Sequence, residues 1–290
     1  MSSIQTDQQN NALEDQDTRP VTVVEAGSGW RVVAWAGLWR YRELLYFFVW
    51  RDLKVRYKQT ILGAAWALLQ PVCTMVVFAY FLGDMGGMAA KIPNYPLFVF
   101  AGILPWTFFA NSITASGNSL VVNQNLVTKV FFPRLIVPLG SVGASLFDFA
   151  VAFVVLGVLM AWYGAGPGTF VVFLPVVILL LILAAIGVGS LLAALIVAYR
   201  DFRYVLQFAV QLWMFATPSI YLRLSDMGPR AKLVLPFNPA FGLILAFRQS
   251  VLGEDFDWYS LTVSSTVTLV ILVVSVSYFW RVERSFADII

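Results

Sequence analysis

Six long apolar runs, separated by short polar stretches, constrain the fold of this chain more than any other feature. A run of roughly 20 apolar residues is long enough to cross the hydrocarbon core of a bilayer as a helix. Apolar residues make up 60% of the chain and charged residues 12%, whereas soluble domains have about 45–50% and 25%. We therefore predict an all-α integral membrane protein with six transmembrane helices. We place them near residues 61–83, 96–117, 135–163, 169–198, 204–222 and 258–280.

The distribution of lysine and arginine predicts how these spans are oriented. Four cations, Arg51, Lys54, Arg56 and Lys58, lie within eight residues just before the first span. With six spans, fourteen of the nineteen lysines and arginines fall on the side that carries both termini. Since short cytoplasmic loops are enriched in these cations, we expect both termini to lie in the cytoplasm.

The region before the first span divides into two segments, and residues 59–290 then form the six-span domain. Residues 1–29 are polar and rich in Gln, Asn and Asp, which is typical of a disordered tail. In residues 30–58 most cations fall on one side of a helical wheel and Trp and Leu on the other, although Arg42 and Arg56 interrupt the apolar side. This pattern predicts an amphipathic helix in the membrane interface. An ordinary juxtamembrane anchor is the simpler alternative.

The connection between the fifth and sixth spans is also apolar in part. Residues 232–237 and 239–247 form two short apolar stretches that are broken at Asn238 and Pro239. Neither stretch is long enough to cross a bilayer. They indicate either re-entrant helices, whose backbone other parts of the protein cover, or a loop packed on the membrane surface.

Several classes of function are disfavoured by residues that the chain lacks. It contains no histidine and one cysteine, Cys73, so the usual acid–base and metal-ligating side chains are scarce. None of its five lysines follows a phosphate-binding Gly-rich pattern. We expect no cofactor or metal in this chain, no nucleic-acid partner, and ATP with magnesium only in a separate partner. A lipid-glycan transferase and an ion-coupled carrier remain weaker alternatives, because such proteins usually need paired carboxylates or several intramembrane charges.

Three further features are candidates for function. Asp148 is the one ionisable residue deep in a predicted span, which suggests either a functional acid or a carboxylate hydrogen-bonded to Ser, Asn or Tyr inside the bundle. The loop 123–134 combines cations with Phe131 and Phe132, which we expect to be exposed and to dock a soluble partner. Aromatic residues also occur in the middle of the first and fifth spans, where their faces suit sugar rings. These are Trp66, Phe78, Tyr80, Phe208, Trp213 and Phe215.

An ordered set of sequence blocks resembles the membrane subunits of type-2 ABC exporters, and among them the permeases that export polysaccharide. The blocks are RDLKVRYKQTILGAAWALLQP (51–71), GILPWTFF (102–109), SLVVNQNLVTKVFFPRLIVPLGS (119–141), YRDFRYVLQFAVQLWMFATPSIY (199–221), FNP (237–239) and AFR (246–248). They run from about residue 40 to the C-terminus, and the tail 1–29 lies outside the resemblance.

The resemblance implies a permease of the bacterial inner membrane that acts as a homodimer with two P-loop ATPase subunits. Its substrate would be a polysaccharide linked to undecaprenyl diphosphate, with O-antigen preferred over capsular polysaccharide or teichoic acid. The channel would run between the two copies and be lined mainly by the first and fifth spans, where the six aromatic residues lie.

The resemblance also implies roles for other residues. The segment before the first span corresponds to the interface helix of the family, and the loop around residues 129–134 to its coupling element. The ATPase-coupling residues would be Arg51, Lys54, Arg56, Lys58, Lys129, Phe131, Phe132 and Arg134. The stretch 223–257 corresponds to the periplasmic gate helices, and the gate residues would be Pro218, Tyr221, Phe237, Asn238 and Pro239.

Overall fold

The computed structural model describes residues 40–58, 65–130, 132–283 and 286, which all belong to one compact unit, Gly37–Ile290. All regular elements in these residues are helices, as the sequence predicts. The predicted tail 1–29 and the first part of the predicted amphipathic helix, residues 30–39, lie outside the described residues.

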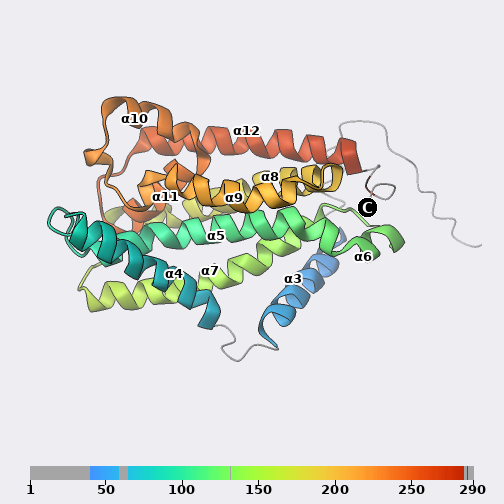
Figure 1. Cartoon of the computed structure of the whole chain (residues 1–290), viewed down its shortest axis with the longest axis horizontal. Coiled ribbons are helices and arrows are strands. Elements are labelled where there is room, and N and C mark those ends of the chain that lie inside the picture. The colour runs from blue at the N-terminus through green and yellow to red at the C-terminus, as the bar shows by residue number, and fades with distance from the viewer. Residues whose placement is uncertain (1–39, 59–64, 131, 284–285, 287–290) are drawn as a thin grey trace, which may run out of the picture. The chain divides into compact units, whose positions relative to one another are not determined.

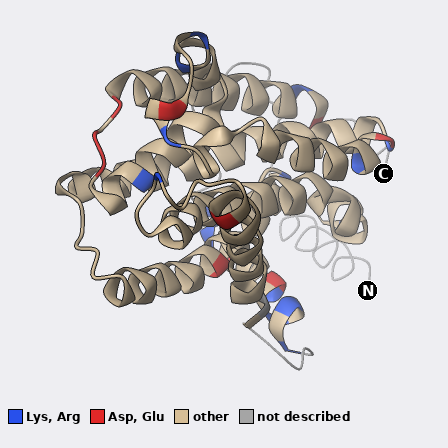
Figure 2. Cartoon of the chain, turned by 60° about the vertical axis from the view of Figure 1, so that its left-hand side comes forward, with Lys and Arg blue, Asp and Glu red and all other residues tan. Residues whose placement is uncertain are grey.

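Five helical stretches are long and apolar enough to cross a membrane (Figure 1). They are α4 (Ala65–Phe78) continued by the π-helix η1 (Ala79–Met85), α5 (Tyr95–Val122), α7 (Ile136–Trp162), the 3-10 helix η2 (Thr169–Phe173) with α8 (Leu174–Ala198), and α12 (Trp258–Val282). Figure 2 shows how few charged residues lie along these helices. They agree with five of the six spans that the apolar runs predict.

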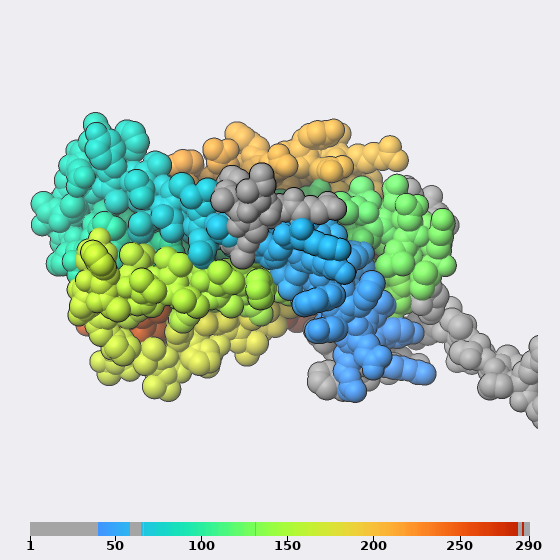
Figure 3. Space-filling view, turned by 90° about the horizontal axis from the view of Figure 1, so that it is seen from below, coloured from blue at the N-terminus to red at the C-terminus, as the bar shows by residue number. Residues whose placement is uncertain are grey.

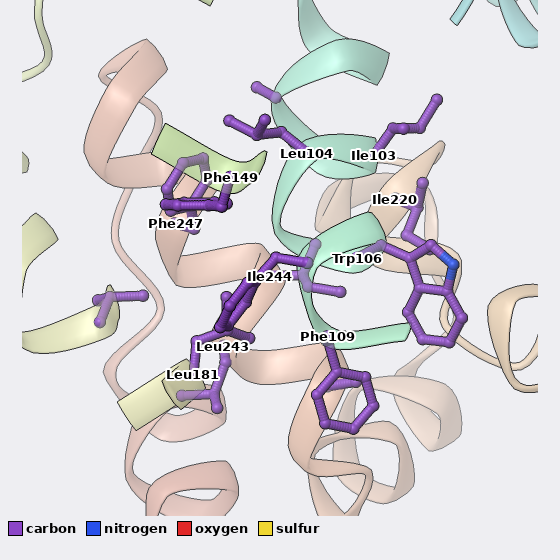
Figure 4. Packing of buried hydrophobic residues seen from close by; sticks show 14 of the residues in the cluster. Ile103, Leu104, Trp106, Phe109, Phe149, Leu181, Ile220, Leu243, Ile244 and Phe247 are labelled. Carbon is purple, nitrogen blue, oxygen red and sulfur yellow. The ribbon is translucent and has the colours of Figure 1, made fainter. Parts of the chain in front are cut away.

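Helix α5 forms the centre of the bundle. It packs against α4, α7 and α8 and is buried along most of its length. Figure 4 shows side chains of α5, α7, α8 and α11 (Pro239–Leu252) meeting in the core. Phe149 of α7 lies 5.3 Å from Phe108 of α5 and 5.9 Å from Phe247 of α11, measured between ring centroids. Because lipid tails are as apolar as these side chains, close van der Waals packing stabilises such a contact in a membrane.

The remaining crossing, predicted at residues 204–222, contains a shorter helix than expected. Two contacts show that α8 and α12 run in the same direction. Phe173, directly before α8, lies 5.3 Å from Trp258 at the start of α12, measured between ring centroids. The last turns of both helices belong to a second apolar cluster. The chain must therefore return between them, and α9 (Phe202–Phe215) makes that return. At 1.5 Å per residue α9 spans about 21 Å, less than the roughly 30 Å of a hydrocarbon core. The 3-10 helix η3 (Pro218–Ile220) follows it.

Between α9 and α12 the chain forms a sharply bent helix pair. The 3-10 helix η4 (Leu224–Asp226) leads into α10 (Pro229–Val234) and η5 (Leu235–Phe237), which meet α11 at an angle of 108°. Arg223 Nε lies 3.3 Å from Glu254 Oε1, so the two flanks of the pair lie at the same end of the bundle. The pair therefore enters and leaves on one side. Since α11 is buried along nearly its whole length, this confirms the re-entrant arrangement rather than a surface loop.

The opposite end of the bundle carries α3 (Arg42–Tyr57) and α6 (Gln124–Lys129) (Figure 1). An apolar cluster joins Phe48 of α3 and Val127 of α6 to the first turn of α7 and the last turns of α8 and α12. We call this end of the bundle the α6 end, and the end with the bent pair the α10 end.

Candidate functional site

The first candidate site is the seat of α3 on α7. Figure 3 shows α3, in blue, against the surface of α7, in yellow-green. Phe48 is fully buried and lies over Gly140, where an added Cβ would come within 2.7 Å of the Phe48 Cβ. One turn further along α7, a Cβ at Gly143 would come within 2.7 Å of Val49 Cγ2. Glycine at these two positions therefore lets the two helices approach closely.

The cations of α3 divide into two groups. Lys54 and Lys58 are exposed. Arg51 is half-buried, bonds to Asp52 at 2.7 Å and lies over the Phe48 ring at 4.7 Å. Arg56 is turned toward α7, where it forms an ion pair with Asp148. The four residues that the sequence grouped as one coupling set thus face two directions.

Asp148 has two partners on α3. The Arg56 guanidinium donates to its Oδ2, and the Tyr57 hydroxyl donates to its Oδ1. Burial, followed by the hydrogen bond to this carboxylate, raises the pKa of Tyr57 from 10.0 to about 12. The tyrosine partner agrees with the hydrogen-bonded alternative for Asp148. Arg56, which the helical wheel showed only as an interruption of the apolar face, is the partner that the sequence did not predict.

Beside Asp148 lies a small polar crevice between α4, α5 and α7. Its polar lining includes Gln70, Thr107, Asn111 and Ser145. The cavity volume is about 30 Å³, which exceeds the roughly 10–15 Å³ that a cavity needs to hold one water molecule.

The loop that holds the predicted coupling element is anchored to α12. Lys129, at the end of α6, is exposed, whereas Phe131 lies outside the described residues. Phe132 is only 5% exposed, so the expectation of an exposed side chain is wrong. Its ring packs on the Phe48 ring of α3, with 6.0 Å between ring centroids.

Arg134 makes the connection to α12. Its backbone N–H donates to Glu283 Oε1 at 2.7 Å, and its guanidinium donates to the Glu283 carbonyl. Burial raises the pKa of the Glu283 carboxyl, and the hydrogen bond from Arg134 opposes that shift. The loop is therefore attached to the end of α12 through Arg134 and to α3 through Phe132.

The aromatic residues of the first and fifth spans also divide into two groups. Three of them are exposed: Tyr80 in η1 of the first span, and Phe208 and Phe215 on α9. Their exposed fractions are 56%, 63% and 57%. Phe78 and Trp213 instead pack inward, Phe78 on Tyr221 at 5.8 Å and Trp213 edge-on to Phe109 at 5.2 Å. The side chain of Trp66 lies outside the described residues.

Asn238 joins three elements at the α10 end. Its Oδ1 accepts hydrogen bonds from the Trp213 indole at 2.9 Å and from the Ala240 N–H at 3.1 Å, which caps α11. Its Nδ2 donates to Thr217 Oγ1 at 3.0 Å. Among the other predicted gate residues, Pro239 is buried, Pro218 and Tyr221 are half-buried, and Phe237 is exposed. The structure thus brings Trp213, predicted in the channel, together with Asn238, predicted in the gate.

Arg248 was counted in the sequence only as a loop cation, but its side chain is fully buried. It stacks over Phe98 at 3.9 Å, bonds to Glu254 at 3.2 Å and donates to the carbonyls of Ser219 and Leu222. Arg248, on α11, therefore connects the turn after α9 and the Phe98 ring of α5 to α11. Its signals in the sequence were its position directly after the apolar stretch 239–247 and its place in the block AFR (246–248), neither of which indicated burial.

This arrangement defines a multi-pass helical membrane protein with a re-entrant pair at one end and, at the other, a loop anchored to the last helix. A family model described as ABC-2 type transporter matches residues 43–252. The chain belongs to the ABC-2 type transporter family, and it is a membrane transport subunit rather than an ATPase.

Curated relatives share most of the chain. An O-antigen export system permease protein RfbA from Myxococcus xanthus is 33% identical, covering 87% of this chain and 96% of its own length. A protein of the same name from Klebsiella pneumoniae is 28% identical over 86% of this chain and 95% of its own. The polysialic acid transport protein KpsM of Escherichia coli is 23% identical over 81% of this chain and 92% of its own.

Proposed function

We propose that this chain is the permease of an ATP-driven exporter that moves a lipid-linked polysaccharide, O-antigen in the first instance, across the bacterial inner membrane. The observation that carries this proposal is the similarity to the RfbA permeases, which extends over 86–87% of the chain. The substrate would be carried on undecaprenyl diphosphate. ATP and magnesium would bind to two P-loop ATPase subunits, because the chain has no phosphate-binding Gly-rich loop.

The α6 end faces the cytoplasm in this proposal, and the α10 end faces the periplasm. The bias of lysine and arginine supports this orientation. Lys54, Lys58 and Lys129 are exposed at the α6 end, where they would contact the ATPase. Arg51, Arg56, Phe132 and Arg134 would act behind them by fixing α3 and the coupling loop to the bundle.

Two copies of the chain would enclose the channel. Tyr80, Phe208 and Phe215 present exposed aromatic rings on the two spans that the resemblance assigns to the channel. Sugar rings stack on such faces through many weak contacts, which lets a long polymer slide. Phe78 and Trp213 would support this wall from behind. Pro218, Tyr221, Phe237, Asn238 and Pro239 would form the periplasmic gate.

Alanine substitution tests the channel wall. We expect F208A combined with F215A to reduce export of the polymer while the complex still assembles. Trp162→Ala is the matched control, because Trp162 is an aromatic residue that is 84% exposed on α7, away from the proposed channel. Export that is unchanged in the double variant, or reduced equally in the control, would count against the channel.

Charge reversal tests the ATPase contact. We expect Lys54→Glu with Lys58→Glu to weaken co-purification of the partner ATPase. Lys91→Glu is the control, since Lys91 is exposed in the loop between η1 and α5, at the α10 end. Equal binding by both variants would contradict the contact.

A capsular polysaccharide is the second candidate substrate, because the similarity to KpsM extends over 81% of the chain. The polymer that disappears from the cell surface when the chain is deleted distinguishes the two substrates.

A further inference from the structure

Among the described residues, α3 is attached mainly to α7. The attachments fall at matching intervals on the two helices: Phe48 lies on Gly140, and Arg56 binds Asp148 eight residues further along each helix. At 1.5 Å per residue the two helices therefore run side by side, in the same direction, for about 12 Å. In between, the Ser141 hydroxyl donates to Asp52 Oδ2 at 3.4 Å.

The two ends of this contact differ in chemistry. At the first end the attachment is van der Waals packing, because the Phe48 Cβ occupies the space above Gly140. At the other end it is ionic, and Asp148 lies twelve residues into α7, or about 18 Å along a helix of about 40 Å.

Both oxygens of the Asp148 carboxylate are engaged by α3. One accepts from Arg56 and the other from Tyr57, and only 14% of the Asp148 side chain is exposed. A carboxylate held in this way is an acceptor already in use, whereas a proton carrier needs a carboxylate that can alternate between partners. The geometry therefore favours attachment over proton transfer.

The ionic contact lies at a junction of helices. Asp148 also lines the crevice where Gln70 and Pro71 of α4 meet Thr107 and Asn111 of α5. A displacement of the end of α3 would thus be passed to α7 at the point where α4 and α5 approach it.

We propose that Asp148 is a positioning residue that, through Arg56 and Tyr57, fixes the C-terminal end of α3 to the middle of α7, so that a movement of α3 is carried into the membrane bundle. This inference rests on the proposed function in one respect, namely that the partner ATPase moves α3. The attachment itself is a property of this chain alone, so the two can be tested separately.

Hydrogen exchange of the permease without its ATPase tests the attachment. We expect Arg56→Ala to speed amide exchange in the last two turns of α3 by about tenfold, since local opening becomes easier. The charge-swapped double variant, Arg56→Asp with Asp148→Arg, should restore protection of these amides. The conservative variant Arg56→Lys should keep part of the protection. Unchanged exchange in Arg56→Ala would overturn the attachment whatever the function of the chain.

The ratio of polymer exported to ATP hydrolysed tests the positioning role in the complete complex. We expect Arg56→Ala and Asp148→Asn to assemble with the ATPase and hydrolyse ATP, but to lower this ratio about fivefold or more, the usual scale of coupling between sites. The charge-swapped double variant should recover most of the wild-type ratio. A ratio that stays normal while α3 exchanges faster would overturn the proposal. So would loss of export in Asp148→Asn alone, with Arg56→Ala normal, because the acid would then act without its partner.

Discussion

Asn238 offers the sharpest test of how the bent pair is held against α9. Its Oδ1 accepts from the Trp213 indole and from the Ala240 N–H, and its Nδ2 donates to Thr217. Replacing Asn238 by alanine removes these three bonds and a fourth, 3.4 Å long, that Nδ2 donates to the Ala216 carbonyl. It also leaves a half-buried indole N–H with no acceptor at this point.

The size of the effect follows from these bonds. Loss of the cap of α11 costs about 1 kcal/mol, and an indole N–H left without a partner costs about 1–3 kcal/mol. We therefore expect Asn238→Ala to destabilise the protein by about 2–4 kcal/mol. Asn238→Asp keeps the accepting oxygen and loses the two bonds that Nδ2 donates to Thr217 Oγ1 and to the Ala216 carbonyl, so it should cost about 1–2 kcal/mol.

A double-mutant cycle with Trp213→Phe isolates the shared bond, with thermal unfolding of the purified protein in lipid nanodiscs as the assay. Since Trp213→Phe removes the N–H donor, Asn238→Ala should cost about 1–3 kcal/mol less in the Trp213→Phe background than in the wild type. If the two substitutions are additive within about 0.5 kcal/mol, Trp213 and Asn238 do not interact, and the assignment of Asn238 as the joint between α9 and α11 is wrong.

Three other predictions concern the α6 end. Gly140→Ala should destabilise the protein by about 1–2 kcal/mol, because overpacking against Phe48 outweighs the gain in helix propensity. Gly157→Ala, on the same helix with open space around it, should be neutral or stabilising by up to about 1 kcal/mol in the same unfolding assay. Equal effects of the two would refute the tight seat of α3. Glu283→Ala should cost about 1–3 kcal/mol, since the Arg134 N–H loses its acceptor, whereas Glu283→Gln keeps the accepting oxygen and should cost less. Burial raises the pKa of Glu283 above its ordinary value of 4.5, so its contribution to stability is complete below that value and declines as the pH rises through the folded pKa. Unfolding measured against pH should show that decline in the wild type and not in Glu283→Gln.

The spans could be predicted from the sequence because membrane hydropathy is a local property. The apolar runs place α5, α7, α8 and α12 within a few residues of where the structure has them. The bend at Asn238 and Pro239 was equally visible, since proline follows a residue whose side chain can cap the next helix. The short helix α9 was harder to predict, because the apolar run continues past Phe215 into η3 while the helix does not.

Contacts between distant residues could not be predicted in the same way. Arg56 and Asp148 are 92 residues apart, and in the sequence each was a separate anomaly, a cation on an apolar face and an acid in a span. Phe132 was expected to be exposed because it lies in a short loop with the cations Lys129 and Arg134, but a ring of α3 covers it. Arg248 was taken for a loop cation, because the carbonyls and the carboxylate that surround it come from segments that fold back onto it.

The most direct test of the central claim is the distribution of the polysaccharide in cells that lack this chain but keep its partner ATPase and the enzymes that make the polymer. The amount of polymer at the cell surface and the amount retained inside are measured separately. We predict that the surface polymer is lost while lipid-linked polymer accumulates on the cytoplasmic side, and that expression of the chain reverses both changes. Surface polymer at the wild-type level, or loss of the polymer from both compartments, would contradict the assignment of this chain as the export permease.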